Sequence, residues 1–192
     1  MIVALGHKKF VGKDTVANIL CDRLGTYLTK RVSFAAPLKT ISHQLFGYGG
    51  LKDGDYYETH TAEKMAVLPL LGKSPRDIWI AVGNDMRQIH SEVWCQAGLS
   101  QAKNAATAIV TDLRYPNEAK ALDEAGAVLV KIERAAALKT DDVADCALDG
   151  YDGWDIVYNN LHPNLDALRD DVVEHLVPAI LEIYKEKANG RY

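Results

Sequence analysis

Near the N-terminus the chain reads Gly6-His7-Lys8-Lys9-Phe10-Val11-Gly12-Lys13-Asp14-Thr15, a basic segment that contains two glycines. The apolar run 1–5 before it predicts a buried strand. The residues after it carry apolar side chains at helical spacing and stop at Gly25, which predicts a helix. Backbone N–H groups at a helix start lack partners within the helix, and the helix dipole favours an anion there. The segment therefore predicts a phosphate-binding loop, with Lys13 on the outer phosphates.

This segment departs from the usual pattern G-x-x-x-x-G-K-[ST] at two positions. His7 stands at the first glycine position, with Gly6 one residue early, and Asp14 stands where a Ser or Thr hydroxyl would bind Mg²⁺. A carboxylate could bind the metal directly or through water, and the sequence does not choose between the two. The alternative is an ordinary basic turn between a strand and a helix. Because the segment follows the first predicted strand, we interpret it as a phosphate site.

The composition is that of an ordinary globular protein. The 192 residues are 48% hydrophobic and 25% charged, and this length suffices for one α/β domain. The net charge of -4 gives no overall attraction to nucleic acid or to an anionic membrane. The sequence has neither a run of about 18 apolar residues nor a signal-peptide pattern. The three cysteines are odd in number and lack metal-binding spacing, so we expect a reduced, cytoplasmic location.

Alternation of strands and helices predicts the fold class. Further strands are expected at 31–35, 108–112, 127–132 and 155–159, with helices at 38–46, 75–89, 92–103, 118–125 and 165–187. This order predicts an α/β fold of the P-loop NTPase type, a three-layer sandwich whose mostly parallel, five-stranded sheet has helices on both faces. We expect a single domain over 1–192, built around the phosphate-binding loop. Residues 48–72 lack periodicity and predict a flap near the substrate, with a short helix around 63–68. The acidic segment 135–151 predicts a lid-like loop.

Charged residues follow several of the predicted strands, and in an open α/β sheet ligands bind beyond the carboxyl ends of the strands. Asp112 ends an apolar strand, where phosphoryl-transfer proteins place a carboxylate for Mg²⁺ or for the attacking oxygen. The alternative role for Asp112 is a cap on the next helix. Arg114 could bind a phosphate through two hydrogen bonds, or pair with Glu118 one helical turn later. Arg134, after the next strand, is a candidate for stabilising charge on the transferred phosphoryl group.

The helix that is predicted to start at Ser74-Pro75 carries two arginines on one face. Arg76 and Arg87 are separated by about three helical turns. Such a pair suits a substrate phosphate, although a solvated helix face is the commoner explanation. The apolar side chains of this helix, up to Ile89, are expected to face the core. Trp94 on the next helix could stack on a base, but most aromatic residues at helical spacing belong to a core.

Four segments spread over most of the chain carry a family resemblance: Gly12-Lys13-Asp14-Thr15-Val16-Ala17, Ser33-Phe34-Ala35-Ala36-Pro37-Leu38-Lys39, Ser74-Pro75-Arg76 and Val110-Thr111-Asp112-Leu113-Arg114-Tyr115-Pro116-Asn117-Glu118-Ala119. With these segments in this order, the chain resembles the bacteriophage deoxynucleoside monophosphate kinase family. The Gly-Lys-Asp-Thr form of the loop is characteristic, because most P-loop proteins have Ser or Thr after the lysine. The Asp-Leu-Arg-Tyr-Pro-Asn-Glu stretch is the more specific signal.

The resemblance implies transfer of the γ-phosphoryl group of ATP to a deoxynucleoside 5′-monophosphate (dNMP), giving the diphosphate, with Mg²⁺, as a step of DNA precursor synthesis. It implies that ATP is bound by Phe10, Val11, Gly12, Lys13, Asp14, Thr15 and Arg134. It implies that the dNMP is bound by Lys9, Ala36, Lys39, Arg76, Arg87, Trp94 and Arg114. The implied catalytic residues are Lys13, Asp14, Asp112, Arg114 and Arg134, with Asp14 and Asp112 as metal ligands.

The expected partners are therefore small-molecule nucleotides, with no nucleic acid and no membrane. The resemblance allows a homodimer, which no feature of the sequence requires, and a phage origin would place the protein in the host cytoplasm. Two other functions stay open. One is a kinase of another small phosphate-bearing or modified-base acceptor. The other is a nucleotide-binding module without turnover, if His7 and Asp14 spoil the metal site. The spacing of residues does not reveal which base is preferred.

Overall fold

The computed structural model describes residues 1–134 and 146–190. By their internal contacts the residues form two compact units. The first comprises Met1–Val32 and Leu99–Tyr192, and the second comprises Ser33–Gly98. Of the predicted lid-like loop, residues 135–145 lie outside the described part of the chain.

A parallel sheet forms the centre of the first unit. Its strands are β1 (Ile2–Gly6), β2 (Thr29–Val32), β3 (Thr107–Leu113), β4 (Val128–Glu133) and β5 (Ile156–Asn159), in the spatial order β2-β3-β1-β4-β5. Val3 of the central β1 is in register with Ile109 on one side and Val128 on the other. Every residue of β1 is buried, because a central parallel strand is covered on both faces. The predicted α/β class and five-stranded parallel sheet are confirmed.

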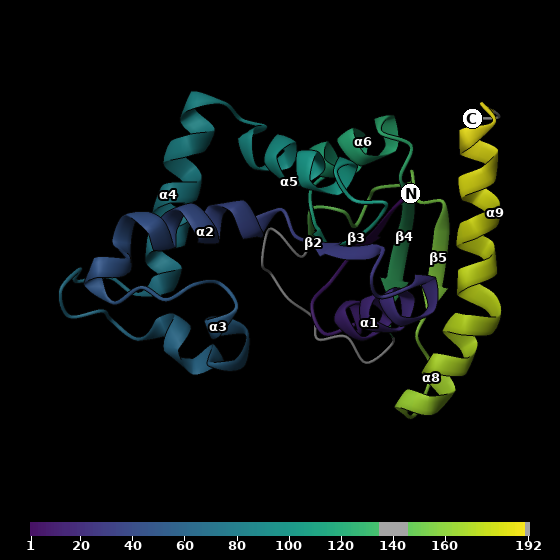
Figure 1. Cartoon of the computed structure of the whole chain (residues 1–192), viewed down its shortest axis with the longest axis horizontal. Coiled ribbons are helices and arrows are strands. Elements are labelled where there is room, and N and C mark those ends of the chain that lie inside the picture. The colour runs from purple at the N-terminus through teal and green to yellow at the C-terminus, as the bar shows by residue number, and fades with distance from the viewer. Residues whose placement is uncertain (135–145, 191–192) are drawn as a thin grey trace. The chain divides into compact units, whose positions relative to one another are not determined.

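The two faces of this sheet carry different helices. The helix α1 (Lys13–Leu24) and α6 (Pro116–Glu124) lie on opposite sides of it (Figure 1). On the α1 side, Val16 and Leu20 join a core with Leu5 and Val130 of the sheet. The same core includes Leu176, from the C-terminal helical segment. Burying each of these side chains stabilises the fold by roughly 1.5–3 kcal/mol.

The C-terminal segment runs from Leu165 to Ala188 and is not a uniform α-helix. It consists of α8 (Leu165–Asp171), a π-helical turn η3 (Val172–Leu176) and α9 (Val177–Ala188). Sequence periodicity predicted one continuous helix here. The π-helical turn keeps Val172 and Leu176 buried against the sheet.

On the other face, α6 packs against β4, and its Ala119 and Leu122 are fully buried. The carboxylate of Glu118 accepts hydrogen bonds from the backbone N–H groups of Arg114 and Tyr115, at 2.9 and 3.1 Å. Because Tyr115 is the N-cap residue and Glu118 lies in the first turn, this carboxylate closes the start of α6.

Helices and turns make up the second unit. It contains α2 (Ala35–Phe46), η1 (Gly47–Gly49), α3 (Tyr56–Thr59), η2 (Thr61–Met65), α4 (Pro75–Ile89) and the beginning of α5 (Val93–Lys103). The predicted start of α4 is confirmed. Ser74 Oγ accepts from the backbone N–H of Asp77 at 3.2 Å, and Asp77 in return accepts from the backbone N–H of Ser74 at 3.2 Å.

Three further details of the predicted elements are wrong. The strand expected at 31–35 ends at Val32, because Ser33 Oγ accepts from the backbone N–H of Ala35 and turns the chain into α2. Ile89, expected in the core, is 79% exposed because it ends α4. The short helix expected at 63–68 is replaced by α3 and by η2, which ends at Met65. The function of 48–72 as a flap stays a prediction.

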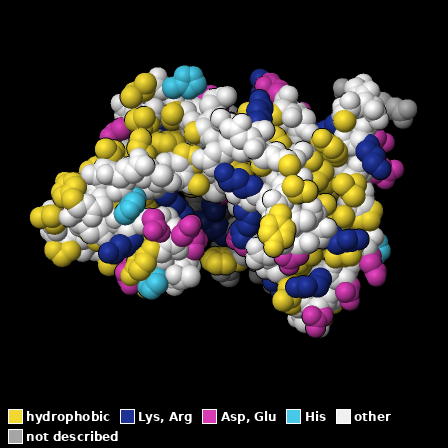
Figure 2. Space-filling model, in the orientation of Figure 1, with side chains coloured by type: hydrophobic (Ala, Val, Ile, Leu, Met, Phe, Trp, Pro, Cys, Tyr) yellow, Lys and Arg dark blue, Asp and Glu magenta, His cyan; other side chains and the backbone are white. Residues whose placement is uncertain are grey.

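Charged side chains of both signs are mixed with hydrophobic ones over the face shown in Figure 2. This pattern agrees with the small net charge of -4. In the described part of the chain, no helix combines the length and the apolar character that crossing a bilayer requires.

Candidate phosphate site

The loop between β1 and α1 adopts an unusual backbone path. The backbone φ angle is +88° at His7, +61° at Phe10 and +97° at Gly12. Positive φ is uncommon for residues other than glycine, so His7 and Phe10 adopt a disfavoured conformation that the surrounding structure must hold in place. His7 therefore adopts a positive φ angle, as a glycine could at this first position of the pattern, although it is not a glycine.

Gly12 is required by its surroundings as well as by its φ angle. A Cβ atom at this position would lie 2.6 Å from Nδ2 of Asn160. That Nδ2 atom donates a hydrogen bond of 3.0 Å to the backbone carbonyl of Val11. Asn160 is 3% exposed and follows directly after β5. The buried side-chain amide of Asn160 thus holds the loop in place through its hydrogen bond to Val11.

Lys13, the first residue of α1, folds back over this loop. Its Nζ atom donates to the backbone carbonyl of His7 at 3.0 Å and also to the carbonyl of Lys8. The residue is 7% exposed, although lysine is rarely buried. The predicted phosphate-binding lysine therefore lies against the loop, at the N-terminal end of α1 where an anion is favoured.

A carboxylate from a distant part of the chain contacts the start of the loop. Asp149 accepts from Nε2 of His7 at 3.3 Å and from Nζ of Lys8, which lies 3.1 Å from Oδ1. Burial and the nearby Lys131 lower the pKa of His7, which favours the neutral form of its imidazole. The hydrogen bond from Lys8 holds the pKa of Asp149 below its ordinary value. The resulting contact between Asp149 and Lys8 is an ion pair.

Asp14, the predicted metal ligand, is paired with an arginine. Arg31 of β2 donates through Nη2 to Oδ1 of Asp14 and through Nη1 to Oδ1 of Asn18, the latter at 2.8 Å. Asp14 and Asn18 are one turn apart on α1, so one guanidinium spans both side chains. The side chain of Asp14 is 80% exposed. One of its two oxygens is therefore engaged by a cation, while the carboxylate faces solvent.

Other predicted site residues of the first unit lie at or beyond the carboxyl ends of β1, β3 and β4, on the same edge of the parallel sheet. Asp112 is half-buried near the end of β3, and Arg114 follows this strand. Arg134 is exposed directly after β4.

In the loop after β1, Lys9 is half-buried, Phe10 is exposed, and Val11 is buried. Thr15 in the first turn of α1 is half-buried. Glu118, the alternative partner of Arg114, accepts a hydrogen bond from the backbone N–H of Arg114, as described above.

The remaining predicted residues belong to the second unit. Arg76 and Arg87 are exposed at opposite ends of α4, and Arg87 donates to Asn84 at 3.5 Å. Ala36 is half-buried near the start of α2. Lys39, on α2, donates to Glu58 at 2.7 Å. Trp94 is 7% exposed, and its indole N–H donates to the carbonyl of Gly83 at 3.1 Å. This indole therefore forms part of the packing between α4 and α5.

The chemistry of the carboxylates fits Mg²⁺. This ion is usually held by one or two carboxylates together with the phosphate oxygens of a substrate, and keeps several waters. Asp14 and Asp112 supply oxygen ligands of that type. Among the described residues, no three His, Cys, Asp or Glu side chains come together as a ready-made metal cage. That Asp14 and Asp112 bind Mg²⁺ stays a prediction.

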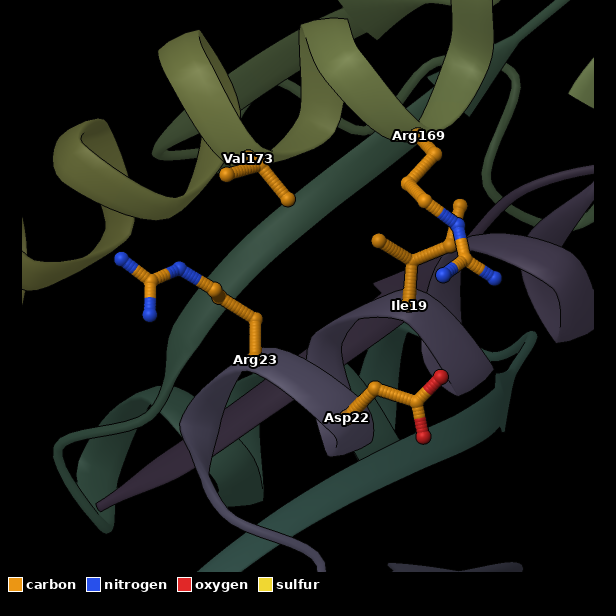
Figure 3. Close-up of a pocket in the computed structure, with 5 residues that line it drawn as sticks. All are labelled: Ile19, Asp22, Arg23, Arg169 and Val173. Carbon is orange, nitrogen blue, oxygen red and sulfur yellow. The ribbon is translucent and has the colours of Figure 1, made fainter. Parts of the chain in front are cut away.

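A separate cavity of about 160 Å³ lies between α1 and the C-terminal helices (Figure 3). It is lined by Ile19, Asp22, Arg23, Arg169 and Val173. None of these is a predicted site residue. Asp22 and Arg23 belong to the last turns of α1, whereas the phosphate loop precedes its first turn. The cavity is therefore distinct from the phosphate site.

No family model matches the sequence. A protein of Acanthamoeba polyphaga mimivirus, provisionally named a deoxynucleotide monophosphate kinase, is 29% identical over 178 residues, covering 83% of this chain and 88% of that protein. The similarity extends over most of both chains. It supports the kinase part of the predicted family, and the link to bacteriophages stays a prediction.

Three residues at this site were missed by the sequence analysis. Arg31 was treated only as part of a strand, and Asp149 only as part of an acidic loop. The acidic character of that loop was a usable signal, because it suggests a basic partner. Asn160 gave no signal at all, since a single asparagine after a strand is ordinary in sequence.

Proposed function

We propose that this protein is a nucleotide kinase, which transfers the γ-phosphoryl group of ATP to a deoxynucleoside 5′-monophosphate and releases ADP and the diphosphate. The observation that carries the proposal is the position of Lys13. It lies at the N-terminus of α1, folded over a loop that contains three residues with positive φ. The similarity to the mimivirus protein supports the same class of reaction.

In this proposal the phosphate loop binds ATP. The backbone N–H groups from Phe10 to Thr15 and the ammonium group of Lys13 face the phosphates, as anion binding at a helix N-terminus requires. Mg²⁺, held by Asp14 and Asp112, would neutralise charge on the phosphates. Arg134 would stabilise the charge on the transferred group.

In the same proposal, the acceptor dNMP is bound by the basic residues predicted for it from the sequence. Lys9, Lys39, Arg76, Arg87 and Arg114 would bind its phosphate and position its oxygen, with Ala36 and Trp94 contributing to the shape of the nucleoside site. Phosphoryl transfer needs little covalent chemistry from the protein, because positioning and charge neutralisation supply most of the acceleration. This role suits a set of cations better than a single general base.

A coupled assay of ADP release tests the proposal. The full chain is incubated with ATP and Mg²⁺ and with each of the four common dNMPs in turn, and then with other phosphate-bearing or modified-base acceptors. Turnover with at least one dNMP is expected. Turnover only with another acceptor would keep the kinase class and change its substrate. Binding of ATP without any turnover would make the protein a nucleotide-binding module.

A further inference from the structure

Asp14 places a negative charge at the N-terminus of α1, where the phosphate of a nucleotide is proposed to bind. The N-terminus of a helix attracts a phosphate, and it attracts the carboxylate of Asp14 for the same reason. Two anions would then share the positive end of α1. Without a compensating cation, the carboxylate would repel the nucleotide that the loop is proposed to bind.

Arg31 lies where that compensation is needed. Its side chain spans Asp14 and Asn18, which share one face of α1. Two separate donors of one guanidinium are used, and these two hydrogen bonds restrain its orientation. Cys21 lies on the same face of α1. Burial raises the pKa of its thiol, and the positive charge of Arg31 opposes that rise.

We propose that Arg31 is a positioning residue of the phosphate site, whose guanidinium neutralises and orients Asp14 so that an aspartate can replace the usual hydroxyl residue after the loop lysine. The inference rests on the proposed function, because it concerns the binding of ATP by this loop. Arg31 acts through Asp14 and has no assigned contact with the nucleotide.

The geometry of β2 supplies a matched control. Side chains alternate along a strand, so Lys30 points to the face opposite that of Arg31. Lys30 is exposed and belongs to the same strand. The variants Arg31→Gln and Lys30→Gln therefore remove the same unit of charge from adjacent positions, and only one of them removes the contact with Asp14.

The experiment is a titration of each variant with a fluorescent ATP analogue, once with Mg²⁺ and once with EDTA. Arg31→Gln is expected to weaken binding roughly tenfold in EDTA, by the repulsion of an unpaired carboxylate. The loss should be smaller with Mg²⁺, because the ion also neutralises Asp14. Lys30→Gln is expected to change the affinity less than about twofold, because its side chain points to the face of β2 opposite that of Arg31 and salt screens its exposed charge.

The double variant Asp14→Asn/Arg31→Gln separates a charge effect from a structural one. The single variant Asp14→Asn supplies the reference affinity for a site without the carboxylate. If Arg31 acts through Asp14, adding Arg31→Gln to Asp14→Asn changes the affinity in EDTA by less than about twofold, because no unpaired carboxylate is left to repel the nucleotide. If Arg31→Gln costs as much in the Asp14→Asn background as in the wild type, the inference is wrong.

Two further results are decisive. Equal affinities for Arg31→Gln and Lys30→Gln would overturn the role of Arg31 while leaving the proposed function intact. Failure of the wild-type chain to bind the ATP analogue would overturn the proposed function and the inference with it.

Arg31→Lys provides a second variant in case Arg31→Gln does not fold. It keeps the charge but lacks the planar group that spans Asp14 and Asn18. We therefore expect its affinity in EDTA to fall below that of Lys30→Gln. Equal affinities of these two variants would overturn the positioning role.

Discussion

Asn160 donates a hydrogen bond from Nδ2 to the backbone carbonyl of Val11 over 3.0 Å, although 149 positions separate the two residues in the chain. The bond connects the end of β5 to the phosphate loop after β1. It also places the amide 2.6 Å from where a Cβ of residue 12 would lie, which is why glycine is needed there. The loop conformation thus depends on the last strand of the sheet.

We expect Asn160→Ala to lower the free energy of unfolding by about 1–3 kcal/mol, because it leaves a buried carbonyl without its partner. It should also weaken ATP binding by loosening the loop. Urea unfolding followed by circular dichroism measures the first effect. Asn159→Ala is the matched control, since Asn159 is the exposed neighbour on β5. Equal stabilities of the two variants would show that the bond to Val11 is unimportant.

Lys13→Ala should lower kcat/KM for the kinase reaction roughly a hundredfold or more, because it removes the ammonium group from the outer phosphates. The measurement is steady-state ADP release. Lys120→Ala, an exposed lysine on α6, serves as the control. A correctly folded Lys13→Ala protein with wild-type activity would remove the phosphate-loop assignment.

Asp149→Asn tests the electrostatic effect of the ion pair with Lys8. Removing this carboxylate raises the positive potential at the loop, so we expect ATP to bind about two- to fivefold more tightly. The free energy of unfolding should fall by less than about 1 kcal/mol, because the pair is partly exposed. Asp152→Asn, an exposed aspartate on the same segment, controls for the change in net charge. Weaker binding by Asp149→Asn alone would mean that Asp149 orders the loop instead.

The pKa of Asp171 predicts how stability responds to acid. Hydrogen bonds from the hydroxyl of Tyr158, and then from His162 and His175, hold this pKa below its ordinary value. A carboxyl with a lowered folded-state pKa stabilises the fold above its unfolded-state pKa, and this contribution is lost as pH falls through the folded-state value. Asp171→Asn should therefore lower stability at neutral pH and flatten its decline below about pH 4.

Thermal melting between pH 7 and pH 2 measures this effect. The exposed neighbour Asp170 provides the control variant, Asp170→Asn. If the melting temperature falls equally steeply with decreasing pH in Asp171→Asn and in the wild type, Asp171 does not cause the loss of stability in acid.

The sheet and the turn between β1 and α1 could be predicted because their signals are local. The run Ile2–Gly6 is apolar throughout, since β1 is buried on both faces, and Gly12-Lys13 marks the turn into α1. Neither feature requires knowledge of distant residues. The start of α4 was predictable for the same reason, since Ser74 and Asp77 are three positions apart.

The contacts that hold the loop could not be predicted, because they depend on strand order. Arg31 contacts Asp14 only because β2 lies beside α1, and Asn160 reaches Val11 only from the end of β5. For Trp94, the helical spacing was visible in the sequence but did not decide the role of the side chain. A tryptophan at helical spacing looks the same in sequence whether it stacks on a base or, as here, donates to the carbonyl of Gly83 within a core.

Arg76 allows the acceptor assignment to be tested separately from ATP binding. The residue is exposed in the first turn of α4, and a guanidinium can bind a phosphate through two hydrogen bonds. We expect Arg76→Ala to raise the KM for dNMP roughly tenfold or more while changing the KM for ATP little, because a charge-assisted hydrogen bond contributes about 1.5–3 kcal/mol. Arg23→Ala, an exposed arginine at the far end of α1 from the phosphate loop, should change neither value. If Arg76→Ala raises the KM for ATP and leaves that for dNMP unchanged, the two nucleotides must exchange places, and Arg76 would then belong to the ATP site.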